Sequence, residues 1–289
     1  MSPTLRRPVP LVALLVLCLA AALALTAPPA DAQPAWAPAD SATIHPGTQT
    51  YTEGAQCTAN FVFTGGGEVY IGQAAHCSGT GGQTETDGCL AGSLPLGTPV
   101  EIDGASRPGT LAYNSWLAMQ QAGETDPDAC AYNDFALVRV HPDDHDLVNP
   151  SLPVIGGPVG LNTDGTAAGE LMHSFGNSSL RLGIETLSPK LAVSLGTSGG
   201  GWTHTHYAVS PGIPGDSGSG FLDDEGNAVG VLSTLAIAPL PASNNASDLS
   251  RSVSYMEAHG GPQVDLALGT EPFTPLIVGG GLPALPGLG

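Results

Sequence analysis

The sequence has 289 residues, of which 42% are hydrophobic and only 11% are charged, and its formal net charge is −19. Such an anionic chain is unsuited to nucleic acid and to anionic membranes, because both carry charge of the same sign. With 40 Gly and 26 Pro, long helices are disfavoured, and we expect short strands joined by many turns.

The N-terminus has the pattern of an export signal over residues 1–32. Arg6 and Arg7 give it a positive start, residues 11–25 form an uninterrupted apolar run, and Ala30-Asp31-Ala32 provides the small residues of a signal peptidase site. The apolar run is too short to span a membrane comfortably. We therefore expect a secreted, extracellular protein that has no contact with the membrane once the signal is removed.

The predicted strands form two batches on either side of a Pro-containing stretch at residues 150–158. An N-terminal arm over residues 33–56, rich in Ala and Pro at its start, precedes them. The first batch, within residues 57–155, comprises 59–64, 68–72, 98–102 and 135–140. The second batch, within residues 156–269, comprises 170–175, 184–195, 204–209, 220–222 and 228–237.

One helix is predicted late in the chain. Leu249, Val253 and Met256 recur there at helical spacing, and Gly260-Gly261 provides a stop. The last segment, residues 270–289, is rich in Pro and Gly and lacks periodicity. We expect it to be a loose tail.

A serine in a glycine-rich setting is the first candidate for chemistry. It lies in Gly215-Asp216-Ser217-Gly218. A serine hydroxyl is a weak nucleophile, and it needs a base beside it and backbone donors aimed at the oxygen that becomes negative. Gly215 lets the chain turn sharply, so that the amides of Gly215 and Ser217 can point at one spot. Taken alone, the block also fits a Gly/Ser turn without chemistry.

A histidine and an aspartate could complete such a site. His76 precedes Cys77, which can form a disulfide with Cys57 and so hold the imidazole in place. Asp134 stands at the head of an apolar strand, where a carboxylate is costly to bury unless it accepts hydrogen bonds. The second ring nitrogen of His76 would be a suitable donor. Taken singly, each residue also fits a purely structural role: His76 as a buried histidine, and Asp134 as a turn aspartate before a strand.

Together, the blocks Ala-Ala-His-Cys, Asp-Phe-Ala-Leu-Val and Gly-Asp-Ser-Gly, in this chain order, resemble the chymotrypsin-like (trypsin-fold) serine peptidases. The resemblance covers residues 57–268 and is greatest to the bacterial secreted branch. It implies an all-β fold in which two antiparallel six-stranded β-barrels pack together with the active site in the cleft between them. It places His76 and Asp134 on the first barrel and Ser217 on the second.

The same resemblance implies a serine endopeptidase that acts on polypeptides through an acyl-enzyme on Ser217. His76 would act as general base and then general acid, with Asp134 orienting it. The amides of Gly215 and Ser217 would form the oxyanion hole. No cofactor or metal is implied, and we expect a monomer.

Two other functions fit the same scaffold. One is a trypsin-fold protein that binds without cutting, although an intact triad counts against it. The other is a secreted esterase, which would share the acyl chemistry. An α/β-hydrolase fits less well, because its nucleophile motif requires glycine where this chain has Ser219 and its triad follows another order.

By resemblance, Pro211 lies at the floor of the substrate pocket, and Ser233, Thr234 and Leu235 form the strand that binds the substrate backbone and lines the wall. Pro211 carries no charge, so we expect Lys and Arg to be rejected. Leu235 stands where relatives with deep pockets have glycine. It would narrow the pocket toward small or medium uncharged residues.

Four cysteines remain once the signal is removed, an even number in an exported chain, which predicts two disulfides. We expect the pairs Cys57–Cys77 and Cys89–Cys130. The second bond would brace the loop that carries Asp134. Joining residue 57 to 130 and 77 to 89 remains the alternative.

Asp216 has no evident partner. In animal relatives this aspartate pairs with the new amine released by a cut before Ile-Val-Gly-Gly, but the only such block here, at residues 277–280, follows Ser217. We interpret that block as coincidence. Asp216 must therefore be held by backbone amides or by one of the basic residues left after signal removal. These are Arg107, Arg139, Arg181, Lys190 and Arg251.

His204 and His206 fall on one face of a predicted strand. Two imidazoles on one face could bind a metal, but no third ligand is in view. We interpret the pair as part of a solvated strand face.

Overall fold

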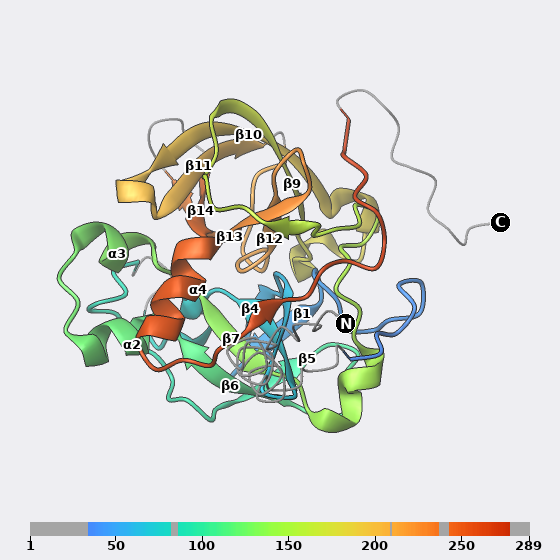
Figure 1. Ribbon diagram of the computed structural model, residues 1–289, viewed down its shortest axis with the longest axis horizontal. Helices are drawn as coiled ribbons and strands as arrows, with labels where there is room; N and C mark the ends of the chain where they lie inside the picture. Colours follow the sequence, from blue (N-terminus) through green and yellow to red (C-terminus); the bar gives the residue numbers. More distant parts are fainter. Residues whose placement is uncertain (1–33, 82–85, 209, 237–242, 278–289) are drawn as a thin grey trace, which may run out of the picture. The chain divides into compact units, whose positions relative to one another are not determined.

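The computed structural model describes residues 34–81, 86–208, 210–236 and 243–277 (Figure 1). All of them belong to one unit, Gln33–Gly289. The predicted export signal lies outside the described residues. Within the described part of the chain, no helix is long and apolar enough to cross a membrane.

The first half is an antiparallel sheet of eight strands in the order β15-β3-β4-β7-β6-β5-β1-β2. Its strands are β1 (Gln49–Thr52), β2 (Ala55–Thr58), β3 (Val62–Gly65), β4 (Glu68–Gln73), β5 (Pro99–Ile102), β6 (Gly109–Asn114), β7 (Ala136–Arg139) and β15 (Asp265–Leu266). Ile71, Val100, Leu111 and Val138 belong to the apolar cluster that this sheet buries. Burial of alternate side chains is what makes these segments strands.

The second half is a closed barrel. Its strands are β8 (Gly160–Leu161), β9 (Ala168–Phe175), β10 (Pro189–Ser198), β11 (Thr203–Ala208), β12 (Gly220–Leu222), β13 (Asn227–Ala236) and β14 (Ser243–Asp248). Six of them run in the order β12-β9-β10-β11-β14-β13, and β12 also pairs with β13, which closes the ring. The short β8 adds a parallel pairing to β13. The all-β architecture of two strand-built halves is confirmed.

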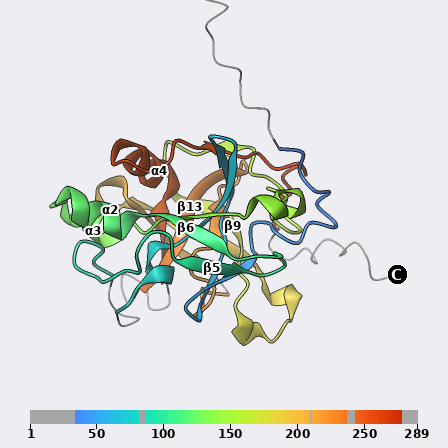
Figure 2. The ribbon, with the colours of Figure 1, turned by 90° about the horizontal axis from the view of Figure 1, so that it is seen from below.

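Three α-helices lie on one side of the unit in both Figure 1 and Figure 2. They are α2 (Ser115–Ala122), α3 (Pro127–Tyr132) and α4 (Leu249–Ala258). The described residues also form five short 3-10 turns: η1 (Ala75–Ser78), η2 (Pro142–Leu147), η3 (Ser179–Arg181), η4 (Glu185–Leu187) and η5 (Gly199–Gly201).

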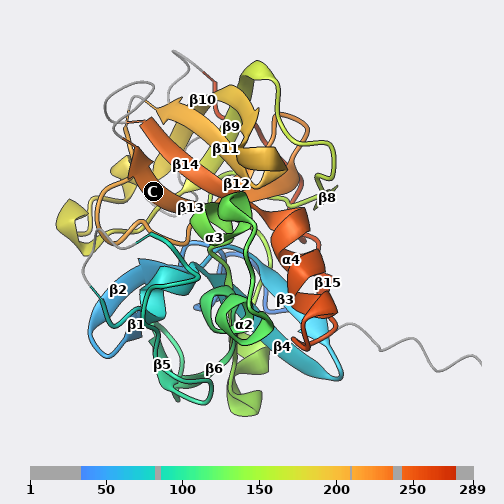
Figure 3. The ribbon, with the colours of Figure 1, turned by 90° about the vertical axis from the view of Figure 1, so that its left-hand side faces the viewer.

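The helix α4 is the one that the sequence predicted. Asp248 caps it by accepting a hydrogen bond from the backbone N–H of Arg251 at 2.7 Å. Leu249 and Met256 are buried on its inner face. The helix leads the chain from β14 back to β15, which pairs with β3 of the first sheet (Figure 3).

The expected N-terminal arm is in part structural. Residues 49–58 form the hairpin of β1 and β2, so the first sheet begins before Cys57. Ahead of it, Ile44 is fully buried and forms a bridge with Val148. The buried Ile44 side chain and backbone hydrogen bonds such as Ala37 N–H to the Val148 carbonyl dock a segment whose Ala/Pro composition predicted a flexible arm.

The expected loose tail is packed over its described part, residues 270–277. The backbone N–H of Thr270 donates to the hydroxyl of Ser151 at 2.9 Å. Phe273 packs edge-on against the buried His173 ring at 5.4 Å between centroids, and Leu276 is 9% exposed. A few apolar side chains in a Pro/Gly-rich segment are enough to dock it, which composition alone does not indicate.

Candidate active site

His76 and Asp134 are brought together by strand pairing. His76 lies in η1, directly after β4, and Asp134 lies two residues before β7, which pairs with β4 in the register Gln73↔Ala136. Nδ1 of His76 is 2.7 Å from Oδ2 of Asp134, and the backbone N–H of His76 donates to Oδ1 at 2.9 Å. Because a carboxylate only accepts, Nδ1 carries the proton, and Nε2 of the neutral ring is left as an acceptor.

The two groups shift each other's titration. Burial opposes the charged imidazolium, but the attraction of Asp134 outweighs it and raises the pKa of His76. Burial likewise opposes the Asp134 carboxylate, yet the attraction of His76 and the hydrogen bonds that Asp134 accepts lower its pKa. The side chain of His76 is 27% exposed and that of Asp134 only 6%. The imidazole can therefore exchange protons with an incoming molecule, while the carboxylate stays ionised behind it.

Ser233 is a third member of this group. Its hydroxyl donates to Oδ2 of Asp134 at 2.6 Å. The ladder between β13 and β14 shifts register between Leu232 and Thr234, so Ser233 sits at an irregularity of the strand. Irregularities of this kind re-aim a side chain. The sequence predicted Ser233 only as part of the strand that binds the substrate backbone, and the hydrogen bond from its side chain to Asp134 is an additional role.

Ser217 is held close to the segment that carries His76. The backbone N–H of Thr58 donates to the Ser217 carbonyl at 2.8 Å. At Gly218, φ is +91°, and a Cβ would lie 2.6 Å from the Thr58 carbonyl oxygen and 2.9 Å from the Ala74 nitrogen. Only glycine allows this close approach to the chain just before His76. Ser217 itself is partly exposed.

The predicted oxyanion-hole residues form a constrained turn. Gly215 has φ +96°, and a Cβ there would lie 2.7 Å from the side-chain oxygen of Gln56. The Gly215 carbonyl is tied back by the hydroxyl of Thr58 at 2.7 Å, and the Pro214 carbonyl by the hydroxyl of Ser178 at 2.6 Å. Within the described residues, the amides of Gly215 and Ser217 have no protein acceptor. Both are therefore available to an external oxygen.

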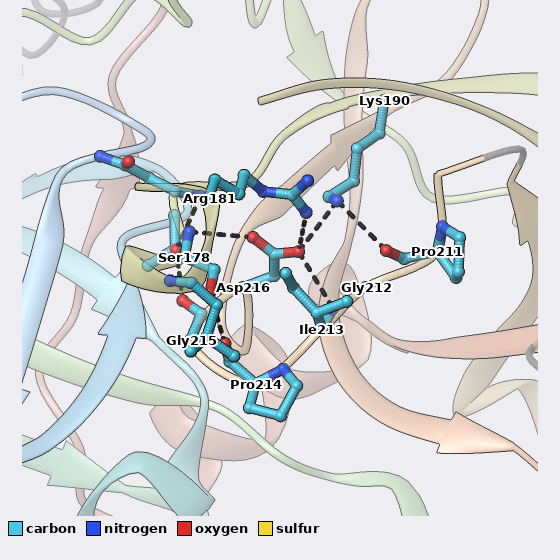
Figure 4. Close-up of polar contacts among 12 residues, drawn as sticks. Ser178, Arg181, Lys190, Pro211, Gly212, Ile213, Pro214, Gly215 and Asp216 are labelled. Carbon is cyan, nitrogen blue, oxygen red and sulfur yellow. Dashed lines mark hydrogen bonds and ion pairs between the residues drawn. The ribbon is translucent and has the colours of Figure 1, made fainter. Parts of the chain in front are cut away.

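Asp216 is fully buried, and the structure settles which cations face it (Figure 4). The guanidinium of Arg181 contacts its carboxylate directly, and Nζ of Lys190 is 2.9 Å from it. The backbone N–H groups of Ser178 and Ile213 donate to the same carboxylate at 3.1 and 3.0 Å. Two of the five basic residues that the sequence offered as partners, Arg181 and Lys190, contact Asp216 at the same time.

Pro211 and Thr234 both border the segment that leads to the nucleophile. The Pro211 carbonyl lies 3.5 Å from Nζ of Lys190. The hydroxyl of Thr234 accepts from the side chain of Asn245 at 3.2 Å. Leu235 pairs with Asn244 in the β13–β14 ladder, and its side chain lies outside the described residues.

Asn244 is a residue that sequence reasoning missed. It is 2% exposed, and its Oδ1 accepts from the backbone N–H of Gly212 at 2.9 Å. Its Nδ2 points to the Thr234 carbonyl at 3.4 Å. Asn244 thus joins the predicted pocket floor to the predicted pocket wall. Its setting in Ser243-Asn244-Asn245 is polar and carries no motif, so the sequence held no signal for it.

Both predicted disulfides are present, Cys57–Cys77 and Cys89–Cys130. The alternative pairing is therefore excluded. Cys130 lies in α3, which ends two residues before Asp134. The first bond ties η1 to β2, and the second anchors the helix that leads into the aspartate.

The interpretation of His204 and His206 as a solvated face is wrong, because both rings are buried. Nε2 of His204 is 2.9 Å from the Asp248 carboxylate. The ring of His206 packs against Phe221 at 4.3 Å between centroids. These residues point into the second barrel, whose interior is more polar than the strand pattern suggested.

Comparisons with known proteins find likeness in structure and not in sequence. No family model and no curated protein matches the chain. Thermobifida fusca Protease A superposes with a TM-score of 0.51 at 17% identity, over 78% of this chain and 99% of that one. A glutamic acid specific serine protease matches at 0.48 and 16%, over 78% and 100% of the two chains. Cellulomonas bogoriensis chymotrypsin matches at 0.45 and 16%, over 78% and 98%.

The first of these likenesses covers nearly all of the bacterial protease. Sequence identity of 17% together with this superposition supports a shared fold and does not show a shared activity. Together with the strand-built halves described above, it shows that the chain has the fold of the bacterial chymotrypsin-like serine proteases.

Proposed function

We propose that the protein is a secreted serine endopeptidase that hydrolyses peptide bonds through an acyl-enzyme on Ser217. The observation that carries the proposal is the His76–Asp134 pair, in which the carboxylate accepts from both Nδ1 and the backbone N–H of His76. This geometry fixes the ring and its tautomer and leaves Nε2 as a base. The constrained turn of Gly215 and Ser217 supports the same conclusion, because its two free amides suit a developing oxyanion.

The residues divide the reaction as follows. Nε2 of His76 takes the proton from the Ser217 hydroxyl while Oγ attacks the substrate carbonyl carbon. The amides of Gly215 and Ser217 stabilise the negative oxygen, and Asp134 stabilises the imidazolium. The imidazolium then gives its proton to the leaving amine, which departs. A water molecule, activated by the neutral His76, hydrolyses the acyl-enzyme and restores Ser217.

Two features support export. The pattern of residues 1–32 is typical of a signal peptide, and the two disulfides require an oxidising compartment. Active protein would therefore be found outside the cytosol.

We propose that small or medium uncharged residues are preferred on the acyl side of the cut bond. Asn244 links the Gly212 amide to the Thr234 carbonyl and so ties the segment beside the predicted pocket floor to the predicted wall. Nζ of Lys190 lies behind the Pro211 carbonyl, which adds repulsion against Lys and Arg. Cleavage-site mapping on an unbiased peptide library tests this, and preference for Lys or Arg would refute it.

The decisive variant for the reaction is Ser217→Ala, assayed on casein and on a short acyl ester. We expect a loss on the order of 10⁴–10⁶ in turnover, because a triad acts as a unit. Ser219→Ala is the matched control, since the buried Ser219 hydroxyl has no partner among the described residues. If Ser217→Ala retained a tenth of the activity, Ser217 would not be the nucleophile. Wild type that cleaves only the ester would be an esterase, and wild type inert to both would be a binding protein.

A further inference from the structure

The cluster around Asp216 contains one more cation than its carboxylate requires (Figure 4). Side-chain exposure is 0% for Asp216, 7% for Arg181 and 1% for Lys190. Arg181 alone would neutralise Asp216. Lys190 therefore adds a second positive charge to a site almost closed to water, which is expensive.

The surroundings of Lys190 offset this cost only in part. Among the described residues, three charged or titratable groups face it: Asp216, Arg181 and, from β11, His206. Burial lowers the pKa of Lys190, the Asp216 carboxylate opposes that shift, and Arg181 adds to it. Burial also lowers the pKa of His206 to about 4, so this ring is neutral under ordinary conditions. The lowered pKa means that folding disfavours the charged form of Lys190, so a gain in charge stabilisation does not account for a lysine here.

The backbone nevertheless makes room for Lys190. A Cβ on Gly176 would lie 2.6 Å from Cε of Lys190 and 2.5 Å from Oδ1 of Asp216. Glycine at this position lets the lysine side chain and the carboxylate meet. The segment around Gly176 is thus shaped to fit the contact between Lys190 and Asp216.

What distinguishes Lys190 from Arg181 is its second contact. Nζ of Lys190 is 2.9 Å from the Asp216 carboxylate and 3.5 Å from the Pro211 carbonyl oxygen. One ammonium group therefore touches both ends of the loop 211–216, whereas the described contacts of Arg181 reach only the Asp216 end. The Gly215 amide lies between these two ends.

We propose that Lys190 is a positioning residue that holds the loop 211–216 in the conformation in which the Gly215 and Ser217 amides form the oxyanion hole. The inference rests on the proposed peptidase function. Lys190 touches neither substrate nor reacting atoms and acts through the Pro211 carbonyl and Asp216. Its removal should therefore lower kcat far more than it changes KM, because the hole is used mainly in the transition state.

The pH dependence gives a second signature. When Lys190 loses its proton, the Pro211 carbonyl and Asp216 lose a donor cation, and kcat should fall. The same step should not reduce stability. Because the folded pKa is lowered from the ordinary 10.5, the native state binds fewer protons than the unfolded state over that interval, and stability rises with pH there. Activity and stability should move in opposite directions on the alkaline side.

The test compares Lys190→Met with Arg139→Met. Methionine keeps the length of the lysine and removes the charge. Arg139 is a matched control, since its cation is 46% exposed and pairs with Glu68 on the first sheet. We expect kcat of Lys190→Met to fall about 10- to 100-fold, somewhat less than for loss of an oxyanion donor itself, with KM within about threefold. Its alkaline limb should be absent, and Arg139→Met should behave as wild type.

The outcomes separate cleanly. Wild-type kcat and an unchanged alkaline limb in Lys190→Met would overturn the proposal. If Lys190→Met does not fold, the wild-type profiles decide. The proposal is supported if wild-type kcat decreases at a pH below the ordinary lysine pKa while Tm stays constant or rises. It is overturned if kcat stays constant up to about pH 10.5. Wild type without activity at any pH would instead refute the peptidase function, and the inference with it.

Discussion

Two buried aspartates in this molecule have opposite surroundings. The side chain of Asp134 is 6% exposed and faces an imidazole that is partly open to solvent, with a serine hydroxyl beside it. Asp216 is 0% exposed and faces two cations that are themselves buried. Both carboxylates accept backbone N–H groups as well. The two aspartates are thus alike in burial and in residue type, and they differ in the side chains that face them.

The difference shows what each carboxylate can do. An imidazole gains and loses its proton near neutral pH, so the charge beside Asp134 changes during a reaction. A guanidinium does not titrate in this range, so Arg181 offers Asp216 a permanent positive charge. Asp134 is therefore suited to controlling proton transfer, whereas Asp216 is suited to holding the backbone of the loop that precedes Ser217.

Asp134→Asn should give the largest effect on activity. The amide keeps the shape but can hold His76 in the wrong tautomer, and we expect kcat to fall about 10⁴-fold at neutral pH. Thermal unfolding should change little. A variant that kept more than a tenth of the wild-type kcat would show that Asp134 does not orient the base.

Asp216→Asn should give the larger effect on stability. It leaves Arg181 and Lys190 buried without a counter-charge, and removing one partner of a buried ion pair costs about 3–5 kcal/mol. Denaturant unfolding of this variant and of Asp134→Asn measures the contrast directly. Equal destabilisation by the two substitutions would contradict the division of roles.

Ser233→Ala should have a smaller effect. It removes the hydroxyl that donates to Asp134 at 2.6 Å, and a hydrogen bond to a charged group is worth about 1.5–3 kcal/mol. We expect kcat to fall about tenfold or somewhat more, with the variant still active. Ser219→Ala again serves as control. An unchanged kcat would mean that Ser233 contributes nothing to the orientation of Asp134.

The pH dependence of kcat/KM gives the smallest effect. The proposed mechanism needs neutral His76, and the attraction of Asp134 raises the pKa of that ring against the effect of burial. The rate should therefore increase with pH through a midpoint above the ordinary 6.5. Below 6.5 the His76–Asp134 attraction also stabilises the fold, and this contribution is lost as pH rises through the folded pKa. A midpoint at or below 6.5 would contradict the assigned pairing.

The candidate site residues were proposed from local sequence patterns. His76, Asp134 and Ser217 each lie in a short block with its own constraints, such as Gly215 at positive φ and a cysteine next to His76. Most of the strands rich in apolar residues were also predicted, because alternating or continuous burial leaves a visible pattern.

What the sequence could not predict depends on the fold. Arg181 lies 35 residues before Asp216, on a loop whose path no local pattern fixes. The strand β14 has the sequence Ser-Asn-Asn-Ala-Ser-Asp, which resembles a turn, yet pairing on both sides buries it. The helices α2 and α3 are short and are started by the caps Asn114 and Asp126. In each case, tertiary contacts override a local signal.

The most direct test of the central claim is to treat the wild-type protein with a fluorophosphonate and to map the adduct by peptide mass spectrometry. Such reagents phosphonylate a serine only when a base activates it and an oxyanion hole receives the phosphoryl oxygen. We predict one adduct, on Ser217, formed in step with loss of casein hydrolysis and absent from His76→Ala. An adduct on another serine, or full hydrolysis without labelling of Ser217, would contradict the account.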